Sequence, residues 1–335
     1  MEFFDGKILA IETSCDETSA AVVEGRRVES SVVASQVEMH ARWGGIVPEA
    51  AARAHVEAIL PTIEEALSKA RIKLDDVAAI AVCNRPGLVG ALSVGVTAAK
   101  ALAFALEVPM VAVHHLEGHI LSPLALPDDL PCPHVCLTVS GGHTEIVRVW
   151  EPMKYEIVGQ TLDDAAGEAF DKGSRLLGLG YPGGAAIQRA AIGGNPRRYR
   201  LPRGLRGETL DFSFSGLKTA ILRLVEAEGD GLSVPDAAAS IQETITSVLA
   251  ERALRAAEAL SAEALTLVGG VAANLLLRER LARACRKAGL AFLTPPPEFC
   301  TDNAAMIGFA GSLRLARGER SDWDTDALPN APLPN

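Results

Sequence analysis

The chain has 335 residues, of which 48% are hydrophobic, and a formal net charge of −10 at pH 7. This length and composition allow a large buried core and suit two domains better than one. The acidic balance argues against broad, nonspecific nucleic-acid binding, although a local basic patch could still dock a defined RNA.

The sequence shows no sign of export, of a membrane span or of a disulfide framework. Acidic residues near Met1 stand where a secretory signal has a basic start, so we expect a cytoplasmic protein. The most apolar stretch, 94–113, is interrupted by charges and a proline, which predicts a buried helix and strand and no membrane contact. The six cysteines form no paired CxxC ladder and no dense framework, so they are expected to be reduced thiols. Cys132 and Cys136 are not expected to bind zinc, because a second thiol pair is lacking.

A strand, a polar turn and a second strand open the chain, and this pattern occurs twice. The first copy is predicted at Lys7–Glu12, Thr13–Thr18 and Ala20–Val23. The second copy is predicted at Val135–Val139, Ser140–Thr144 and Glu145–Val149. Further strands are predicted at Val77–Val82 and Leu265–Gly269, and helices at Pro48–Lys69, Leu92–Leu106 and Asn274–Ala288.

This alternation predicts an α/β fold, and the duplication predicts two similar lobes. We expect lobe I at 1–117 with 301–325, lobe II at 118–300, and a loosely ordered tail at 326–335. The proline- and aspartate-rich segment Pro123–Pro133 is interpreted as the crossing between the lobes.

The polar turns carry the candidate chemistry. Ser140-Gly141-Gly142 can point several backbone N–H groups at one phosphate or carboxylate oxygen. A single copy would more often be a plain hairpin turn. Two such turns, with the glycine-rich bend at 269–274, resemble the actin, Hsp70 and sugar-kinase (ASKHA) superfamily, which has its active site in the cleft between the lobes. Asp16 then stands where that superfamily has an acid near phosphates, unless it only caps the turn.

Two histidines and an aspartate form a candidate metal site. His115 and His119 are four residues apart, so on a helix both imidazoles can reach one ion. Asp302, at the predicted start of a helix, could add a carboxylate. Two histidines and one carboxylate with open positions suit Fe²⁺ or Zn²⁺, and affinity order alone does not choose between them.

The segment His115-Leu-Glu-Gly-His119 also suggests a metallopeptidase. A zincin, however, has its glutamate directly after the first histidine. Glu117 follows His115 by two residues, roughly 200° around a helix. We therefore expect Glu117 to be a solvated or structural acid and not a general base.

An arginine-rich loop is the one basic patch on this acidic chain. Arg197, Arg198 and Arg200 flank Tyr199, and two more arginines follow closely. The common fate of such a loop is plain solvation, but arginine planes can also pair with phosphates and stack on unpaired bases. The loop is therefore a candidate site for RNA.

Ordered sequence blocks along most of the chain resemble one family. They are Ile11–Thr18, Gly44–Glu49 with Arg53 and His55, His115–His119, Val139–Thr144, Phe170–Lys172, Tyr181–Gly184, Phe212–Lys218, Gly269–Asn274 and Thr301–Asn303. Together they closely resemble the TsaD (YgjD/Gcp) family, in its bacterial form, over residues 7–317. Trp43 departs from the expected tyrosine before the Gly-Gly pair, which bears on loop packing more than on chemistry.

The resemblance implies a tRNA N6-adenosine threonylcarbamoyltransferase. Such an enzyme transfers the threonylcarbamoyl group from threonylcarbamoyl-adenylate to the exocyclic N6 amine of the adenosine that follows the anticodon in tRNAs reading ANN codons. It further implies one Fe²⁺ or Zn²⁺ ion per chain, with Fe²⁺ preferred, and two companions, a TsaB-like paralogue and a TsaE-like ATPase.

By position, the resemblance also assigns site residues. It makes His115, His119 and Asp302 the metal ligands, and Asp16 is our choice for the catalytic base. It makes the following residues substrate-binding: Thr138, Val139, Ser140, Gly141, Gly142, Asp171, Gly184 and Asn274. Without it, Asp171 would be interpreted as a surface ion pair with Lys172, Gly184 as a helix-entry turn and Asn274 as a helix cap.

Two other classes of function stay open. A small-molecule kinase of the same superfamily would use the phosphate loops but would leave the paired histidines without a role. A noncatalytic ATP-driven switch would use the histidines as structural zinc ligands and would transfer no group.

Overall fold

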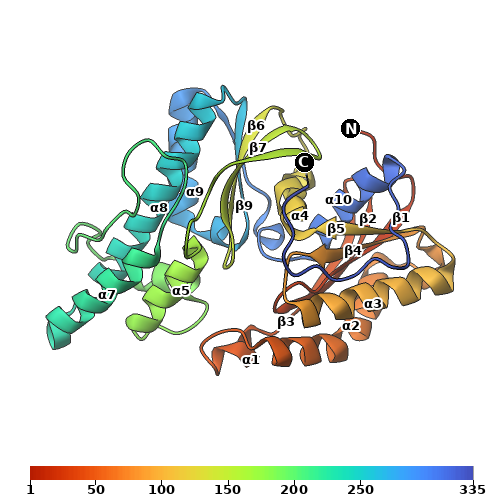
Figure 1. Ribbon diagram of the computed structural model, residues 1–335, viewed down its shortest axis with the longest axis horizontal. Coiled ribbons are helices and arrows are strands. Elements are labelled where there is room, and N and C mark those ends of the chain that lie inside the picture. Colours follow the sequence, from red (N-terminus) through yellow and green to blue (C-terminus); the bar gives the residue numbers. More distant parts are fainter. Residues whose placement is uncertain (335) are drawn as a thin grey trace. The chain divides into compact units, whose positions relative to one another are not determined.

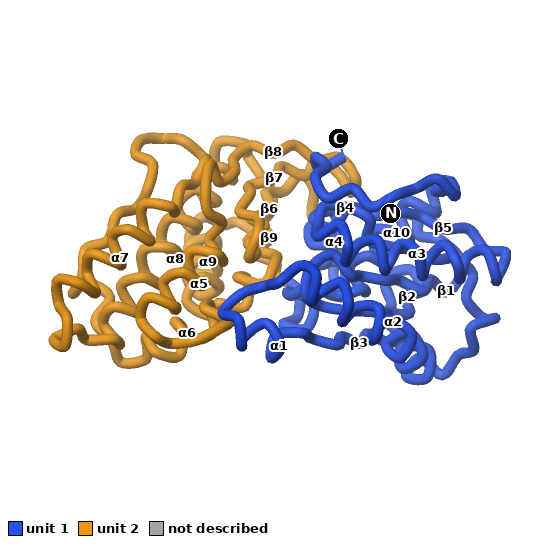
Figure 2. The backbone as a smooth tube through the Cα atoms, turned by 60° about the horizontal axis from the view of Figure 1, so that its bottom comes forward, with its two compact units in different colours: residues 1–130, 295–335 blue, residues 131–294 orange. Residues whose placement is uncertain are grey.

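The computed structural model describes residues 1–334, which form two compact units (Figures 1 and 2). Unit 1 comprises residues 1–130 and 295–335, and unit 2 comprises residues 131–294. Each unit contains a five-stranded sheet, ordered β3-β2-β1-β4-β5 in unit 1 and β10-β9-β6-β7-β8 in unit 2. This confirms the predicted α/β fold.

The strands and helices of unit 1 are the following. Its strands are β1 (Lys7–Glu12), β2 (Glu17–Glu24), β3 (Arg27–Ser35), β4 (Ala79–Arg85) and β5 (Met110–His114). Its helices are α1 (Val37–Ala41), α2 (Pro48–Ala70), α3 (Val89–Leu106), α4 (His115–Leu121) and α10 (Ala304–Ala316). Short 3₁₀ turns lie at Leu74–Asp76 (η1), Ser122–Ala125 (η2) and Pro297–Phe299 (η5).

Unit 2 repeats the same kinds of element. Its strands are β6 (His134–Val139), β7 (Thr144–Glu151), β8 (Lys154–Gln160), β9 (Ala264–Val268) and β10 (Ala291–Leu293). Its helices are α5 (Ala166–Leu176), α6 (Gly183–Ala190), α7 (Ser215–Glu228), α8 (Val234–Ala259) and α9 (Leu275–Ala288). Its 3₁₀ turns are Gly229–Gly231 (η3) and Gly270–Ala273 (η4).

The two sheets have the same connectivity. In unit 1, β1 pairs antiparallel with β2 and parallel with β4, and β4 pairs parallel with β5. In unit 2, β6 pairs antiparallel with β7 and parallel with β9, and β9 pairs parallel with β10. The repeated strand–turn–strand pattern of the sequence is therefore the opening hairpin of each unit.

The core of unit 1 follows from the alternation of side chains along its strands. Leu9 and Ile11 of β1 point to the face that α2 and α3 cover. Helix α10 packs on the opposite face (Figure 1), where a Cβ on Gly308 would lie 2.6 Å from Val23 and one on Gly311 would lie 2.5 Å from Ala81. Glycine at these positions allows the helix to approach the sheet closely.

Among residues 1–334, α3 alone is long and apolar enough to cross a membrane. It packs against β4 and α2, as the core helix of a globular unit does.

The boundaries of the units differ from those expected. We placed the first boundary at 117/118, but the chain leaves unit 1 at Leu130 and returns at Pro295. Residues 118–125 stay with unit 1 because α4 and η2 pack against α10. The segment Asp326–Pro334, expected to be loose, buries Ala327 and Leu333 and donates the Leu328 N–H to the Asn84 carbonyl (2.8 Å).

Candidate functional site

Helix α4 brings the two predicted metal-binding histidines together in unit 1. It begins directly after the buried strand β5, so His115 and His119 lie at the edge of the sheet. Their four-residue spacing places both on one helix face, with ring centroids 4.7 Å apart. Both side chains are buried.

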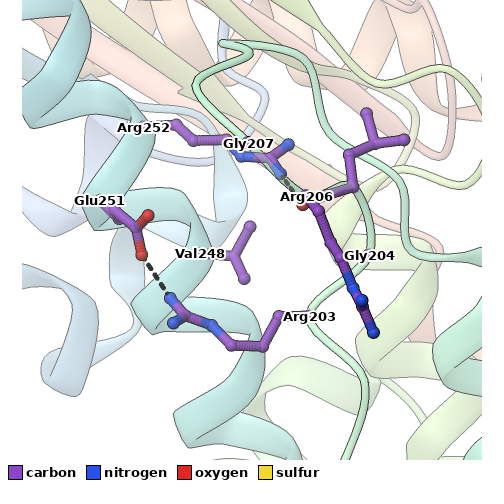
Figure 3. A pocket seen from close by; sticks show the side chains of 8 residues that line it. Arg203, Gly204, Arg206, Gly207, Val248, Glu251 and Arg252 are labelled. Atoms are coloured by element: carbon purple, nitrogen blue, oxygen red, sulfur yellow. Dashed lines mark hydrogen bonds and ion pairs between the residues drawn. The ribbon is translucent and has the colours of Figure 1, made fainter.

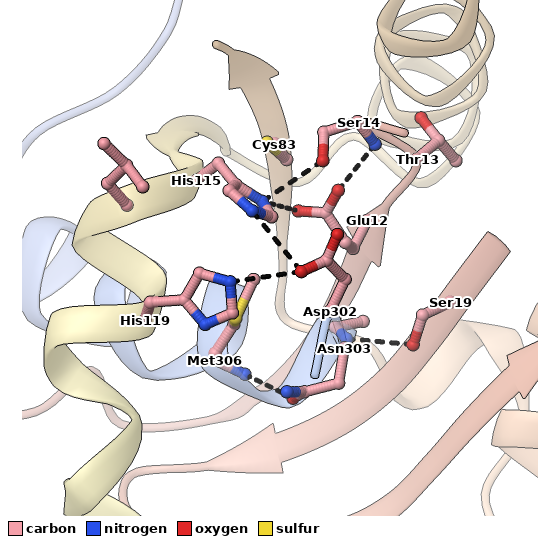
Figure 4. A network of polar contacts seen from close by, with 12 residues as sticks. Glu12, Thr13, Ser14, Ser19, Cys83, His115, His119, Asp302, Asn303 and Met306 are labelled. Carbon is pink, nitrogen blue, oxygen red and sulfur yellow. Dashed lines mark hydrogen bonds and ion pairs between the residues drawn. The ribbon is translucent and has the colours of Figure 1, made fainter. Parts of the chain in front are cut away.

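Asp302 reaches the same point from the start of α10. Asn303 caps this helix by accepting the Met306 N–H (3.0 Å), which fixes the preceding residue. The Oδ1 atom of Asp302 lies 3.1 Å from His119 Nε2 and 3.5 Å from His115 Nε2 (Figure 4). The structure therefore joins the three predicted ligands, although 183 residues separate His119 from Asp302.

The donor set suits a divalent transition metal. One ligand atom from each of the three residues lies within 4.8 Å of the others, so one ion could contact all three. Nitrogen and carboxylate donors of this kind fit Fe²⁺ or Zn²⁺. His119 Nδ1 is also buried without a hydrogen-bond partner among residues 1–334, so the protein alone does not satisfy the polar atoms of this group.

The pKa values of the two histidines are shifted in opposite directions. Burial alone would lower the pKa of His115, but the carboxylates of Asp302 and Glu12 raise it to about 9. Burial and the neighbouring His115 lower the pKa of His119 despite its hydrogen bond to Asp302. Because a metal ligand must be a neutral imidazole, an ion would displace the His115 proton.

Glu12 is the residue of this site that the sequence analysis did not assign. It is fully buried at the end of β1, and its Oε2 lies 3.2 Å from His115 Nδ1. Its Oε1 accepts the Ser14 N–H at 2.6 Å. Cys83 Sγ completes a second close group with Glu12 and His115, and burial raises the pKa of this thiol well above its usual value.

Asp16 lies in the turn after β1 and is partly buried. Burial and the charge of Asp302 raise the pKa of the Asp16 carboxyl above its ordinary value. Its carbonyl accepts the Gln36 N–H (3.1 Å), which anchors the turn. The carboxyl is therefore electrostatically coupled to the predicted metal ligands.

Glu117 is a structural acid. It is fully buried, and its Oε2 accepts the Arg314 Nε–H (2.8 Å) and lies 2.8 Å from Arg314 Nη2. The carboxylate of Glu117 lies on the side of the helix away from the histidines, as the spacing within the helix predicts, and is paired there with Arg314. Glu117 therefore cannot act as the general base of a peptidase in this arrangement.

In unit 2, the turn Ser140–His143 leaves its backbone open. Ser140 N–H donates to the His143 carbonyl (2.8 Å), and His143 N–H donates to Ser140 Oγ (3.1 Å). A Cβ on Gly141 or Gly142 would meet no atom within 4 Å, and both residues are exposed. Glycine here is therefore not required by crowding.

The start of α5 lies against this turn. A Cβ on Gly167 would lie 2.5 Å from the Ser140 carbonyl oxygen, so only glycine permits the approach. The predicted substrate residues Thr138 and Val139 lie on β6 and are fully buried.

The remaining predicted substrate residues of unit 2 are linked through α6. Asp171 Oδ1 accepts the Gly183 N–H (2.7 Å), and the side chain of Lys172 pairs with Asp164 and Glu168. At Gly184 an added Cβ would meet nothing within 4 Å. Asn274 accepts the Leu277 N–H (3.1 Å) as the N-cap of α9, as its alternative interpretation proposed, and donates to Gln242 (3.1 Å).

The five arginines of the candidate RNA loop are exposed but not equivalent. Arg203 pairs with Glu251 at 2.6 Å, and Arg198 lies 3.6 Å from Asp236. Within residues 1–334 no ion pair is formed by the other three, Arg197, Arg200 and Arg206. A cavity of about 340 Å³ beside this loop (Figure 3) is lined by Arg203, Gly204, Leu205, Arg206, Gly207, Val248, Glu251 and Arg252.

Solved structures with this fold define the class. Component A of (R)-2-hydroxyglutaryl-CoA dehydratase from Acidaminococcus fermentans aligns with a TM-score of 0.55 at 14% identity, covering 93% of this chain and all of that one. HypF from T. kodakarensis aligns with a TM-score of 0.63 at 15% identity, covering 94% of this chain and 48% of that one. The chain thus shares the fold of these proteins, two α/β units with the same sheet connectivity, and its first unit holds a group of two histidines and one carboxylate.

Sequence relatives identify the family. The family model for TsaD, described as tRNA N6-adenosine threonylcarbamoyltransferase, matches residues 27–309. Proteins of that name from Syntrophotalea carbinolica and Anaeromyxobacter dehalogenans are 51% and 52% identical to this chain, over 97% and 96% of its length and 96% and 98% of theirs. The chain belongs to the TsaD family and is a transferase that modifies tRNA.

Proposed function

We propose that this enzyme transfers the threonylcarbamoyl group from threonylcarbamoyl-adenylate to the N6 amine of the adenosine following the anticodon, in tRNAs that read ANN codons. The observation that carries the proposal is the convergence of both His115 and His119 Nε2 atoms on Asp302 Oδ1. A small-molecule kinase would have no use for this buried group. Family membership supplies the reaction class.

His115, His119 and Asp302 would hold one Fe²⁺ or Zn²⁺ ion, with Fe²⁺ preferred. When bound, the ion would supply Lewis acidity for a substrate carbonyl. The pKa of His115, raised to about 9, means that the site must lose this proton when it is loaded at neutral pH. Metal affinity should therefore increase with pH.

The turn of unit 2 is our candidate for the adenylate phosphate. Gly141 and Gly142 are exposed residues beside the start of α5, and backbone N–H groups in such a turn suit an anion. Those donors would also stabilise the charge that the departing AMP takes up when the carbonyl–oxygen bond to phosphate breaks. Thr138 and Val139, buried on β6, would hold this turn in place, while Asp171, Gly184 and Asn274 would surround the nucleoside.

Asp16 is our candidate for the base that accepts the proton of the attacking N6 amine. Burial and Asp302 raise the pKa of its carboxyl, which brings it closer to the working pH of a proton acceptor. The new bond joins N6 to the carbamoyl carbon. AMP leaves with the electrons of the broken bond.

We further propose a TsaB-like paralogue and a TsaE-like ATPase as companions of this cytoplasmic enzyme. Helix α2 is our candidate surface for a partner, because part of its apolar stripe is buried in the core and part is exposed. Ile59 and Ile63 are buried in the core, whereas Val56 is 63% and Leu60 is 60% exposed. Exposed apolar residues one turn apart suit contact with another protein.

The test is a reconstituted reaction read by mass spectrometry. The chain, its two companions, threonine, bicarbonate and ATP are incubated with an unmodified tRNA that reads an ANN codon. We expect threonylcarbamoyladenosine in its anticodon loop and none in a tRNA that reads another codon class. A phosphorylated small molecule with no modified nucleoside would instead favour the kinase.

A further inference from the structure

Glu12 is a buried acid whose charge is compensated by one histidine. Its side chain is fully buried, and a buried carboxylate is costly unless it is paired and hydrogen-bonded. Among residues 1–334, no lysine or arginine forms an ion pair with it. Its partners are the Ser14 N–H at 2.6 Å and His115 Nδ1 at 3.2 Å (Figure 4).

This contact decides which nitrogen of His115 faces the ion. Ser14 Oγ lies 3.1 Å from the same Nδ1 atom, and its hydroxyl can accept as well as donate. An ionised carboxylate can only accept hydrogen bonds, so a hydrogen on Nδ1 satisfies both Glu12 and Ser14. In the neutral ring, Nε2 is then left with its lone pair, and this atom is the one directed at Asp302, 3.5 Å away. Carboxylates commonly orient metal-binding histidines in this way.

The turn that follows Glu12 is held rigidly. Thr13 Oγ1 donates to the Ala91 carbonyl (2.9 Å), and the Ser14 carbonyl accepts the Leu88 N–H (2.8 Å). A Cβ on Gly95 would lie 2.4 Å from Thr13 Oγ1, and one on Gly87 would lie 2.5 Å from the Ser14 carbonyl oxygen. Close packing on both residues fixes the end of β1 and with it the carboxylate.

We propose that Glu12 is a positioning residue, which holds His115 in the orientation and tautomer that bind the metal ion. This inference rests on the metal site of the proposed function. Of the three predicted ligands, His115 is the one that Glu12 contacts directly, while its charge also acts on Asp302.

Glu117 provides a matched control. It is another fully buried acid and lies on the helix of both histidines, but its carboxylate pairs with Arg314. Glu117→Gln removes a buried charge of the same kind without touching a ligand. An effect of Glu12→Gln that Glu117→Gln lacks therefore belongs to the surroundings of Glu12, in which His115 is the predicted metal ligand that it contacts.

The experiment measures the affinity for Zn²⁺ by competition with a chelator, and the visible spectrum of the Co²⁺-loaded protein. We expect Glu12→Gln to weaken Zn²⁺ binding by about 10-fold or more and to alter the Co²⁺ bands, because the amide no longer fixes the tautomer. Glu117→Gln should bind both ions as the unaltered chain does. Circular dichroism checks that each variant is folded.

Three results would overturn the proposal. The first is a folded Glu12→Gln with unchanged affinity and spectrum, and the second is an equal loss in Glu117→Gln. If Glu12→Gln does not fold, Glu12→Asp keeps the charge on a shorter stem and should still bind Zn²⁺ more weakly; unchanged affinity there would be equally decisive. The third, no uptake of either ion by the unaltered chain, would differ from these by removing the proposed metal site itself.

Discussion

The two units begin with the same hairpin but use it differently. In unit 1 the first strand ends in the buried acid Glu12, whereas in unit 2 the corresponding strand ends in the buried Val139. The turn after Glu12 is packed against α3 and leads to ionisable side chains, while the turn after Val139 exposes two glycines. The proposed function thus assigns a side-chain site to one copy of the duplicated fold and a backbone site to the other.

We expect the largest effect from the removal of a predicted metal ligand from unit 1. His119→Ala should lower metal affinity by about 100-fold or more, since even residues behind the ligands cost 10- to 100-fold. Transferase activity should fall with it, while the fold persists because α4 keeps its other contacts. Metal content of the purified variant is the measurement. Full occupancy in His119→Ala would exclude the site.

Unit 2 is tested by placing a methyl group on its open turn. Gly141→Ala adds a Cβ that meets no protein atom, so the unfolding free energy should change by less than about 0.5 kcal/mol. A phosphate on the backbone would meet that methyl group, and we expect the affinity for AMP to fall by about tenfold, roughly the 1.4 kcal/mol of one well-made hydrogen bond. Titration calorimetry with AMP measures the loss.

Gly216→Ala is the matched control for Gly141→Ala. It also lies in unit 2, in the first turn of α7, and its added Cβ likewise meets no atom within 4 Å. It should stabilise α7 by about 0.5 kcal/mol, as alanine does in place of an uncrowded helical glycine, and leave AMP affinity unchanged. Equal AMP binding by Gly141→Ala and Gly216→Ala would show that the turn is only a hairpin.

The sequence predicts the candidate metal ligands better than it predicts the residue that contacts them. His115 and His119 are found because helical spacing relates them, and Asp302 because it precedes a helix start. Glu12 has no such spacing, since 103 residues separate it from His115 and only the pairing of β1, β4 and β5 brings them together. A single acid closing an apolar strand was the available signal.

Helix prediction fails in a similar way within unit 2. Helix α8, 26 residues long, is alanine-rich and buried on several faces, so it has no clear apolar stripe for periodicity to detect. By contrast, both opening hairpins and α2, α3 and α9 were predicted close to their observed bounds. Their polar turns and caps mark where each element begins.

A smaller effect concerns RNA binding by the arginine loop of unit 2. Of its five arginines, Arg197, Arg200 and Arg206 form no ion pair among residues 1–334 and are free to meet phosphates. Replacing these three by alanine should weaken tRNA binding about fivefold at moderate salt and lower its salt dependence by roughly 0.7 to 0.9 in slope per lost phosphate contact. Affinities at several salt concentrations measure both.

The two paired arginines serve as the control for this loop. Arg198 and Arg203 already lie beside Asp236 and Glu251, so replacing both should alter tRNA affinity less than the triple change. Identical affinity and slope in all three proteins would return the loop to the solvated surface. The path of the RNA would then be sought on the partner proteins.

The last prediction concerns Glu145 on β7, where we expect a change in stability and none in transferase activity. Burial raises the pKa of this carboxyl from 4.5 to about 7, so the folded chain holds a proton between those pH values that the unfolded chain has lost. The contribution of Glu145 to the free energy of unfolding is fully present below pH 4.5. It decreases as the pH rises to about 7 and stays at that lower value at higher pH. Glu145→Gln should remove that slope and stabilise unit 2 above pH 7 by about 2 kcal/mol, with transferase activity unchanged. Urea unfolding at pH 5 and pH 8 measures the difference, and equal pH slopes in both proteins would contradict it.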